Sequence, residues 1–339
     1  QIREPAAPTS QLKVHRGGLC GTFGIGQQPM RKHRCSGTDD SITLGFRLNR
    51  SHAARHPADA SAKQRIQTLL TAGSQRNFRD ERRYVRSEMN HAGVTMGVSW
   101  MTSGQRPAKP SVMAHRGGAA LGPENSVDTF ALAAATGANS VEVDLVQTAD
   151  GQLVMLHDAF LTDGDVWRWV RDLTLDEITE VTGKRPGTHL DLLSSCAELG
   201  IGLYAEVKAA NAESLDRLVA DIIEEGLNEL VCVASFRADI VAYVARQGAI
   251  DTSWLFLDPG SDPLAVAQDL GCRFVHPCFD LMPDLVDLME GEWIERLWNA
   301  GLGVVSWNTV SPELMAKMTQ AGVAAICTDD PRVVPELLD

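Results

Sequence analysis

The sequence predicts an α/β fold, a closed TIM (β/α)8 barrel over residues 111–339, preceded by a basic, low-order N-terminal extension over residues 1–110. Three observations support this prediction. Short apolar runs alternate with amphipathic stretches of helical period throughout the second region. Eight such apolar runs occur in 229 residues, close to the length of about 250 residues that such barrels need. Charge and apolar content also change abruptly near residue 110.

The first 110 residues contain 18 Lys or Arg and 7 Asp or Glu, whereas the remaining residues contain 13 and 37. Gln, Ser, Gly and Pro are frequent in this first region and apolar side chains are sparse. Such a segment cannot bury enough apolar surface to offset the entropy of its chain, so we expect it to be largely disordered. A basic segment can bind nucleic acid or anionic lipid, but this one lacks interleaved aromatic residues and any nucleic-acid motif. Upstream sequence that is not normally translated is another alternative. We expect no nucleic-acid partner for the barrel.

Apolar runs bounded by turn residues are typical of buried parallel strands. They cover residues 112–114, 140–146, 202–208, 230–236, 252–257, 273–277, 303–308 and 324–328. A doubly wound open sheet is the alternative architecture. No Gly-x-Gly-x-x-Gly motif follows the first run, so the closed barrel is favoured.

Stretches of helical period lie between the strands. The clearest covers residues 212–225, where Leu215, Leu218 and Ile222 share one stripe and acidic residues lie opposite. The others cover residues 126–136, 192–199, 238–247, 263–270, 284–300 and 312–321. Several end at a glycine, the residue that a left-handed C-cap favours. Glu124 and Asn125 start the first helix, where Asn125 can cap exposed amides. A part in the site is the alternative for both residues.

The connection over residues 159–190 is too long for a simple loop and predicts a small insertion after the second strand. It carries Trp167-Arg168-Trp169. These side chains could cover a choline head group by cation–π contact or touch a lipid surface. Packing of the insertion on the barrel is the alternative.

Compartment signals are few. No run of about 18 apolar residues exists, so we expect no membrane-spanning helix. Arg82-Arg83 precedes a short apolar stretch that Arg86 and Glu88 interrupt, which disfavours export by a twin-arginine signal. The seven cysteines form no Cys-x-x-Cys pair, so we expect buried free thiols in a reducing compartment and a cytoplasmic protein.

Ionisable residues gather at the predicted strand ends, which line the active site of such a barrel. They are His115 and Arg116 after the first strand, Glu142 and Asp144 on the second, His157 shortly after it, and Glu206 and Lys208 on the third. Residues two apart face the same side of a strand, so Glu142 and Asp144 point together. Trp307, on the seventh strand, is assigned to an apolar wall of the substrate site, with packing in the core as the alternative.

Three carboxylates in one place would repel each other unless a cation binds them. Oxygen ligands favour a hard divalent ion, Mg²⁺ or Ca²⁺, at Glu142, Asp144 and Glu206. Such an ion, together with Arg116 and Lys208, would form a positively charged site that suits a phosphate group. His115 and His157 could then act as general base and general acid, because imidazole titrates near neutral pH.

These motifs resemble the glycerophosphodiester phosphodiesterase family over residues 111–339. The resemblance rests on His115-Arg116-Gly117, Pro123-Glu124-Asn125-Ser126, Glu142-x-Asp144, His157-Asp158, Glu206-x-Lys208 and Thr328-Asp329-Asp330-Pro331. It implies metal-dependent hydrolysis of small phosphodiesters, such as glycerophosphocholine, to glycerol 3-phosphate and an alcohol. It also implies His115 and His157 as the acid/base pair, Glu142, Asp144 and Glu206 as metal ligands, and Arg116 and Lys208 as phosphate ligands.

Other functions stay open at this point. A lysophospholipase D-like or sphingomyelinase-like enzyme would use the same centre and require membrane contact, which the net charge of the barrel disfavours on anionic lipid. A non-catalytic binding barrel is the remaining alternative. We expect Asp329 and Asp330 to orient the loop that closes the barrel.

Overall fold

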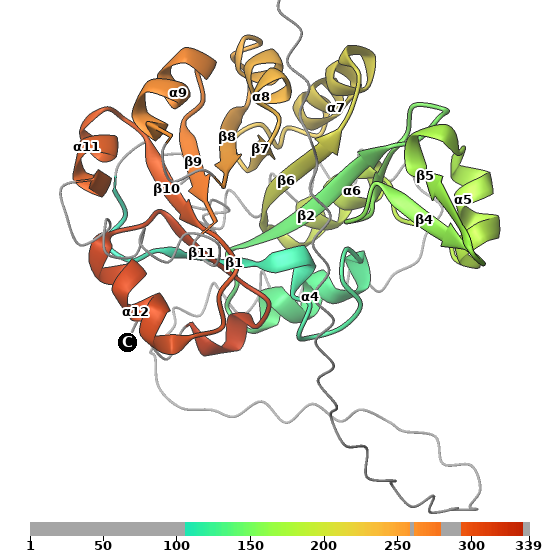
Figure 1. The fold of residues 1–339 in the computed structure, drawn as a ribbon. Coiled ribbons are helices and arrows are strands. Elements are labelled where there is room, and N and C mark those ends of the chain that lie inside the picture. The colour runs from blue at the N-terminus through green and yellow to red at the C-terminus, as the bar shows by residue number, and fades with distance from the viewer. Residues whose placement is uncertain (1–105, 258–260, 279–292, 335–339) are drawn as a thin grey trace, which may run out of the picture. The chain divides into compact units, whose positions relative to one another are not determined.

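The computed structural model describes residues 106–257, 261–278 and 293–334. Within these ranges, eight parallel strands form a closed barrel (Figure 1). The first strand, β1 (Ser111–Ala114), pairs with the last, β11 (Ala325–Thr328), and also with β2 (Ser140–Gln147). The others are β6 (Gly202–Ala209), β7 (Val231–Ser235), β8 (Asp251–Phe256), β9 (Phe274–Pro277) and β10 (Gly303–Ser306). Because β1 has a partner on each side, the predicted barrel is confirmed and an open sheet is excluded.

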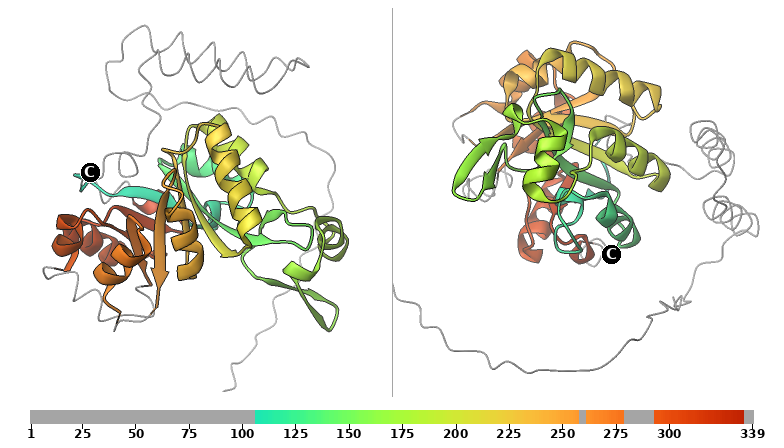
Figure 2. Two further views of the ribbon diagram at one scale, coloured as in Figure 1. Left: turned by 90° about the horizontal axis from the view of Figure 1, so that it is seen from above. Right: turned by 90° about the vertical axis from the view of Figure 1, so that its right-hand side faces the viewer.

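Helices follow the strands and cover the outside of the barrel (Figures 1 and 2). They are α4 (Val127–Ala135), α6 (His189–Leu199), α7 (Ala212–Glu224), α8 (Ala238–Ala245), α9 (Pro263–Leu270), α11 (Trp293–Asn299) and α12 (Pro312–Ala321). Helix α6 begins earlier than the expected residue 192, because Thr188 and Asp191 form a capping box. The first part of the helix expected over 284–300 lies outside the described residues.

Two apolar layers build the core. One lies inside the barrel and includes Met113, Tyr204 and Phe274. The other lies between the sheet and the helices and includes Val141, Val143 and Leu145 of β2. Side chains alternate along a strand, so the residues between these valines and leucine, at positions 142 and 144, face the barrel interior.

The insertion after β2 is confirmed. Strand β3 (Leu153–Met155) pairs antiparallel with β2, and then a hairpin of β4 (Phe160–Asp163) and β5 (Val166–Trp169) precedes α5 (Leu175–Thr182). A cluster of apolar side chains packs it against β2: Val146, Val154, Val170, Leu173 and Ile178. Trp167 and Trp169 remain 67% and 50% exposed. They contact Phe160 of their own hairpin, so the packing involves other residues of the insertion.

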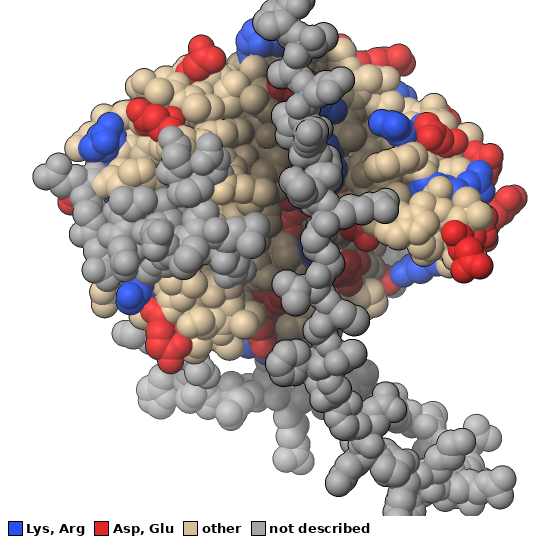
Figure 3. Space-filling model, viewed as in Figure 1, with Lys and Arg blue, Asp and Glu red and all other residues tan. Residues whose placement is uncertain are grey.

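Charged side chains of both signs gather over β4, β5 and α5 on the face shown in Figure 3. Two ion pairs belong to this region, Arg168 with Asp163 and Arg171 with Asp172. The arginine of the Trp-Arg-Trp sequence therefore has a carboxylate partner within its own hairpin.

The five described cysteines are buried and none of them is in a disulfide, as expected: Cys196, Cys232, Cys272, Cys278 and Cys327. Cys20 and Cys35 lie outside the described residues, as does nearly all of the segment expected to be of low order. Among the helices that the structure describes, none is both long and apolar enough to span a bilayer.

Candidate active site

The turn after β1 brings a backbone donor to the barrel interior. His115, Arg116 and Gly117 form a short 3-10 helix in which Arg116 has φ 49° and Gly117 has φ 82°. A Cβ atom on Gly117 would lie 2.6 Å from Cε1 of Phe130 in α4, so glycine permits both the turn and its packing. The backbone N–H of Arg116 donates to Oε2 of Glu142 at 2.8 Å.

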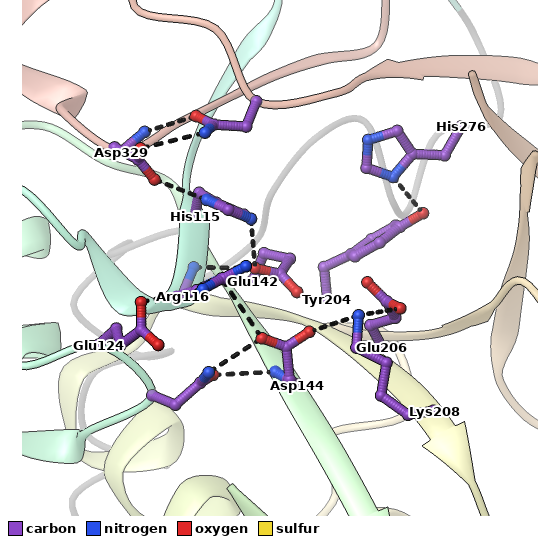
Figure 4. Close-up of polar contacts among 12 residues, drawn as sticks. His115, Arg116, Glu124, Glu142, Asp144, Tyr204, Glu206, Lys208, His276 and Asp329 are labelled. Atoms are coloured by element: carbon purple, nitrogen blue, oxygen red, sulfur yellow. Dashed lines mark hydrogen bonds and ion pairs between the residues drawn. The ribbon is translucent and has the colours of Figure 1, made fainter. Parts of the chain in front are cut away.

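Three buried carboxylates lie inside the barrel on adjacent strands (Figure 4). Asp144 of β2 is the register partner of Glu206 of β6, and Glu142 lies two residues before Asp144. One oxygen of each of the three lies within 4.8 Å of the others. Glu142, Asp144 and Glu206 are 3%, 1% and 5% exposed. The predicted carboxylate cluster therefore forms.

Burial and repulsion change the acidity of this cluster. Burial raises the pKa of Glu142 well above its ordinary value, and the charge of Asp144 raises it further. Burial also raises the pKa of Glu206, although Lys208 opposes that change. Oε1 of Glu142 has no hydrogen-bond partner among the described residues. A cation among these oxygens would relieve both the repulsion and the unpartnered oxygen.

Two basic side chains adjoin the carboxylates. Lys208 contacts Glu206 and lies 2.9 Å from Oδ1 of Asp144. Nε of Arg116 lies 3.6 Å from Oδ2 of Asp144, and its Nη1 donates to Oε2 of Glu124 at 3.0 Å. The predicted combination of acids and bases is thus present in one place.

The two predicted histidines differ in their contacts and in their exposure. Nε2 of His115 is 3.9 Å from Oε2 of Glu142. His157 pairs with the adjacent Asp158 at 2.8 Å, and its charge lowers the pKa of Glu206. The side chain of His157 is 38% exposed, against 16% for His115. One imidazole is therefore enclosed and the other is open to solvent.

Asp329 is a site residue that the sequence assigned to another role. Its Oδ1 lies 2.6 Å from Nδ1 of His115, and its Oδ2 accepts from the amide of Asn308 at 3.0 Å (Figure 4). Asp329 follows β11 directly, as His115 follows β1, and these strands pair. That pairing is the signal that could have revealed the contact. Only Asp330 acts as expected, since it accepts from Arg332 in the closing turn.

Of the two roles that the sequence left open for Asn125, the structure shows contact with the site and not the helix cap. Ser126 occupies the N-cap of α4, while Asn125 adopts φ 50°. Its amide donates to Oδ2 of Asp144 at 2.9 Å, and its Oδ1 accepts from the Asp144 backbone at 3.0 Å. Asn125 is 9% exposed, and its two hydrogen bonds fix the Asp144 carboxylate within the cluster.

A cavity lies next to the carboxylates. Its walls are His115, Glu142, Glu206, Leu255, His276, Trp307, Asn308 and Cys327. Trp307 also packs against the rings of Phe236 and His276, each with a centroid distance of 5.3 Å. Trp307 therefore lines the cavity and also packs on the barrel core. Its part in binding substrate stays a prediction.

Comparisons with known proteins agree with this geometry. The model of the glycerophosphoryl diester phosphodiesterase family matches residues 115–333. "Probable glycerophosphodiester phosphodiesterase 1" of Mycobacterium tuberculosis is 47% identical over 251 residues, which are 66% of this chain and 90% of that protein. The glycerophosphodiester phosphodiesterase of Caldanaerobacter subterraneus is 28% identical over 255 residues, 68% of this chain and 98% of the relative.

Solved structures show the same fold. A glycerophosphodiester phosphodiesterase from Parabacteroides distasonis has a TM-score of 0.59 at 23% identity, covering 68% of this chain and 97% of its own. An Oleispira antarctica phosphodiesterase, solved with its product sn-glycerol-3-phosphate, has a TM-score of 0.54 at 21% identity, with 68% and 97% covered. Because the family model matches most of the barrel, the chain belongs to the glycerophosphoryl diester phosphodiesterase family and is a phosphoric diester hydrolase.

Proposed function

We propose that the enzyme hydrolyses glycerophosphodiesters, such as glycerophosphocholine, to glycerol 3-phosphate and an alcohol. In this proposal His115 and His157 are the acid/base pair, and Arg116 and Lys208 bind the phosphate. The observation that supports it best is the buried cluster of three carboxylates with basic side chains and an oriented imidazole around it. The product bound to the Oleispira antarctica neighbour is consistent with this substrate class.

Glu142, Asp144 and Glu206 would hold a divalent cation, Mg²⁺ or Ca²⁺. Their donor atoms are all carboxylate oxygens, the type that both ions prefer. The unpartnered Oε1 of Glu142 and its raised pKa both indicate that these side chains are adapted to a bound charge. When bound, the cation would stabilise negative charge on the phosphoryl oxygens.

The first step needs two proton transfers. One histidine takes the proton of the glycerol 2-hydroxyl as its oxygen attacks phosphorus, and the other gives a proton to the departing alkoxide. The alcohol leaves, and the phosphate becomes cyclic on the glycerol. His115 is suited to this work because Asp329 fixes its ring through Nδ1 and directs Nε2 toward the carboxylate cluster.

The second step reverses these roles. Water attacks the cyclic phosphate, the bond to the glycerol 2-oxygen breaks, and glycerol 3-phosphate forms. The histidine that accepted a proton now returns it, and the other accepts a proton from water. Each imidazole must therefore gain and lose a proton near neutral pH, which is the range in which imidazole titrates.

The test is release of glycerol 3-phosphate from glycerophosphocholine by the full chain. We expect activity that chelation with EDTA abolishes and that Mg²⁺ or Ca²⁺ restores. The restoring ion should also raise the melting temperature, because an ion that binds the folded state stabilises it. His115→Ala and Glu142→Gln should lower kcat by about 100-fold or more.

Glu198→Gln is the matched control, because Glu198 is exposed in the last turn of α6, which leads into the start of β6 at the opposite end of the barrel from the site. It should behave like the wild type in every assay. Unchanged turnover after chelation would contradict the cation role, and unchanged turnover in His115→Ala would contradict the acid/base role. Faster hydrolysis of lysophosphatidylcholine or sphingomyelin than of glycerophosphocholine would favour the lipid-directed alternatives.

A further inference from the structure

Three polar side chains form a hydrogen-bonded group inside the barrel: Tyr204 of β6, two residues before Glu206, Ser253 of β8 and His276 of β9. The Tyr204 hydroxyl donates to Oγ of Ser253 at 2.7 Å. It also lies 3.0 Å from Nδ1 of His276 (Figure 4). All three residues are buried, and His276 is 3% exposed. Polar side chains so deep in a barrel core lower stability unless their hydrogen bonds are satisfied.

One ring nitrogen in this hydrogen-bonded group lacks a hydrogen-bond partner. Nε2 of His276 is buried and has none among the described residues. His276 lines the cavity that it shares with His115, Glu142 and Glu206. Its Nδ1 side is occupied by Tyr204, so Nε2 is the ring nitrogen left to meet a ligand there.

The imidazole of His276 is neutral at physiological pH. Burial lowers the pKa of His276 to about 3, and the charges of His115 and Lys208 lower it further, while the Ser306 backbone acts in the opposite direction. A neutral imidazole has one N–H and one bare nitrogen. A hydroxyl can accept from the first or donate to the second, so it satisfies Nε2 in either tautomer.

The substrate has one hydroxyl for this position. The 3-oxygen of the glycerol is bonded to phosphorus, and the 2-hydroxyl is the nucleophile next to the acid/base pair. The terminal 1-hydroxyl is then free to reach the cavity wall. In a lysophospholipid an acyl chain replaces the proton of this hydroxyl, so that oxygen can no longer donate a hydrogen bond. Leu255, Trp307 and Cys327 are further walls of the same cavity.

We propose that Nε2 of His276 binds the terminal hydroxyl of the glycerol moiety, and that this contact selects deacylated glycerophosphodiesters over lysophospholipids. The inference rests on the proposed function and adds a specificity residue to it. His276 lies outside the acid/base pair, so its loss should raise KM for the glycerol substrate more than it lowers kcat.

The test compares two substrates and three forms of the enzyme, each with the whole 339-residue chain. Glycerophosphocholine carries the terminal hydroxyl, and 2-hydroxypropyl phosphocholine lacks it but keeps the 2-hydroxyl. We expect the wild type to prefer glycerophosphocholine by about 10- to 100-fold in kcat/KM, because a site that binds a hydroxyl rejects the analogue without it. His276→Leu should abolish this preference, and His276→Asn, whose amide can still bond a hydroxyl, should keep part of it.

The outcomes separate the two proposals. Equal use of both substrates by the wild type, or an equal loss on both substrates in His276→Leu, would overturn the role of His276 and leave the proposed function standing. No turnover of either substrate by the wild type would overturn the proposed function and this inference with it. If His276→Leu fails to fold, as judged by circular dichroism, His276→Asn and the wild-type substrate ratio decide the question.

Discussion

His115 depends for its orientation on residues that are distant in sequence. Asp329 holds Nδ1, and Asn308 holds Asp329 through two hydrogen bonds, one from its side-chain amide and one from the Asp329 backbone. The hydrogen bond with His115 lowers the pKa of Asp329, so this carboxylate is ionised at neutral pH. An ionised partner at Nδ1 fixes the ring and stabilises its protonated form.

Asp329→Asn tests this role. We expect kcat to fall by about 100-fold with little change in KM, because a misoriented imidazole transfers protons poorly. Steady-state kinetics on glycerophosphocholine measure it. Asp330→Asn is the control, since the neighbouring Asp330 pairs with Arg332 and not with His115. Equal losses in the two variants would show that the effect comes from the closing loop as a whole.

His276 gives a prediction about stability against pH. Its pKa is about 3 in the folded protein and about 6.5 in an unfolded chain. As pH falls through this interval, the unfolded state binds a proton that the folded state excludes, so stability falls. As pH falls, the free energy of unfolding of the wild type should decrease relative to that of His276→Leu, by up to about 1.4 kcal/mol per pH unit. Urea titrations with EDTA present measure this, and a difference that does not vary with pH would contradict it.

The turn after β1 is the element that joins the fold to the site. Arg116, Gly117 and Gly118 all have positive φ, with values of 49°, 82° and 100°. This backbone turns the Arg116 N–H toward Glu142 while α4 packs against the other side. The conformation disfavours most side chains, which explains the two consecutive glycines.

Gly117→Ala should lower the free energy of unfolding by about 1–3 kcal/mol and reduce activity, because the new Cβ must displace Phe130. Gly164→Ala is the matched control: Gly164, between β4 and β5, has φ 60°, and a Cβ added there would meet no atom within 4 Å. Its cost should be limited to about 1 kcal/mol from the backbone alone. Chemical denaturation compares the two, and equal costs would contradict the packing role of Phe130.

At the scale of the whole molecule, the barrel and the basic segment before it differ in charge and composition. We propose that residues 111–339 are the catalytic domain and that residues 1–110 are a separate extension. The segment from His115 to Val333 contains the family match and every site residue described above. Each barrel strand also finds its partners among the described residues from 106 onward.

Removal of residues 1–105 should therefore leave kcat/KM on glycerophosphocholine and the melting temperature close to those of the full chain. Activity assays and calorimetry on the two forms measure this. Aggregation or loss of turnover in the shortened form would show that the barrel requires the N-terminal segment.

Local patterns in the sequence determined much of this protein. Apolar runs and helical periods predicted all eight barrel strands and most helix positions, and the spacing of Glu142 and Asp144 placed both carboxylates on one face. The motifs also identified the family. These features depend on residues near each other in the chain, so a single sequence is sufficient to read them.

Only the tertiary structure decided which residues contact each other across the barrel. The pairing of β1 with β11 joins His115 to Asp329, 214 positions away. The register of β6, β8 and β9 joins Tyr204 to Ser253 and His276. Such contacts depend on how the barrel closes and on strand register, and local periodicity does not specify either. The sequence therefore revealed the acids and bases, while the closed barrel determined the partners that orient them.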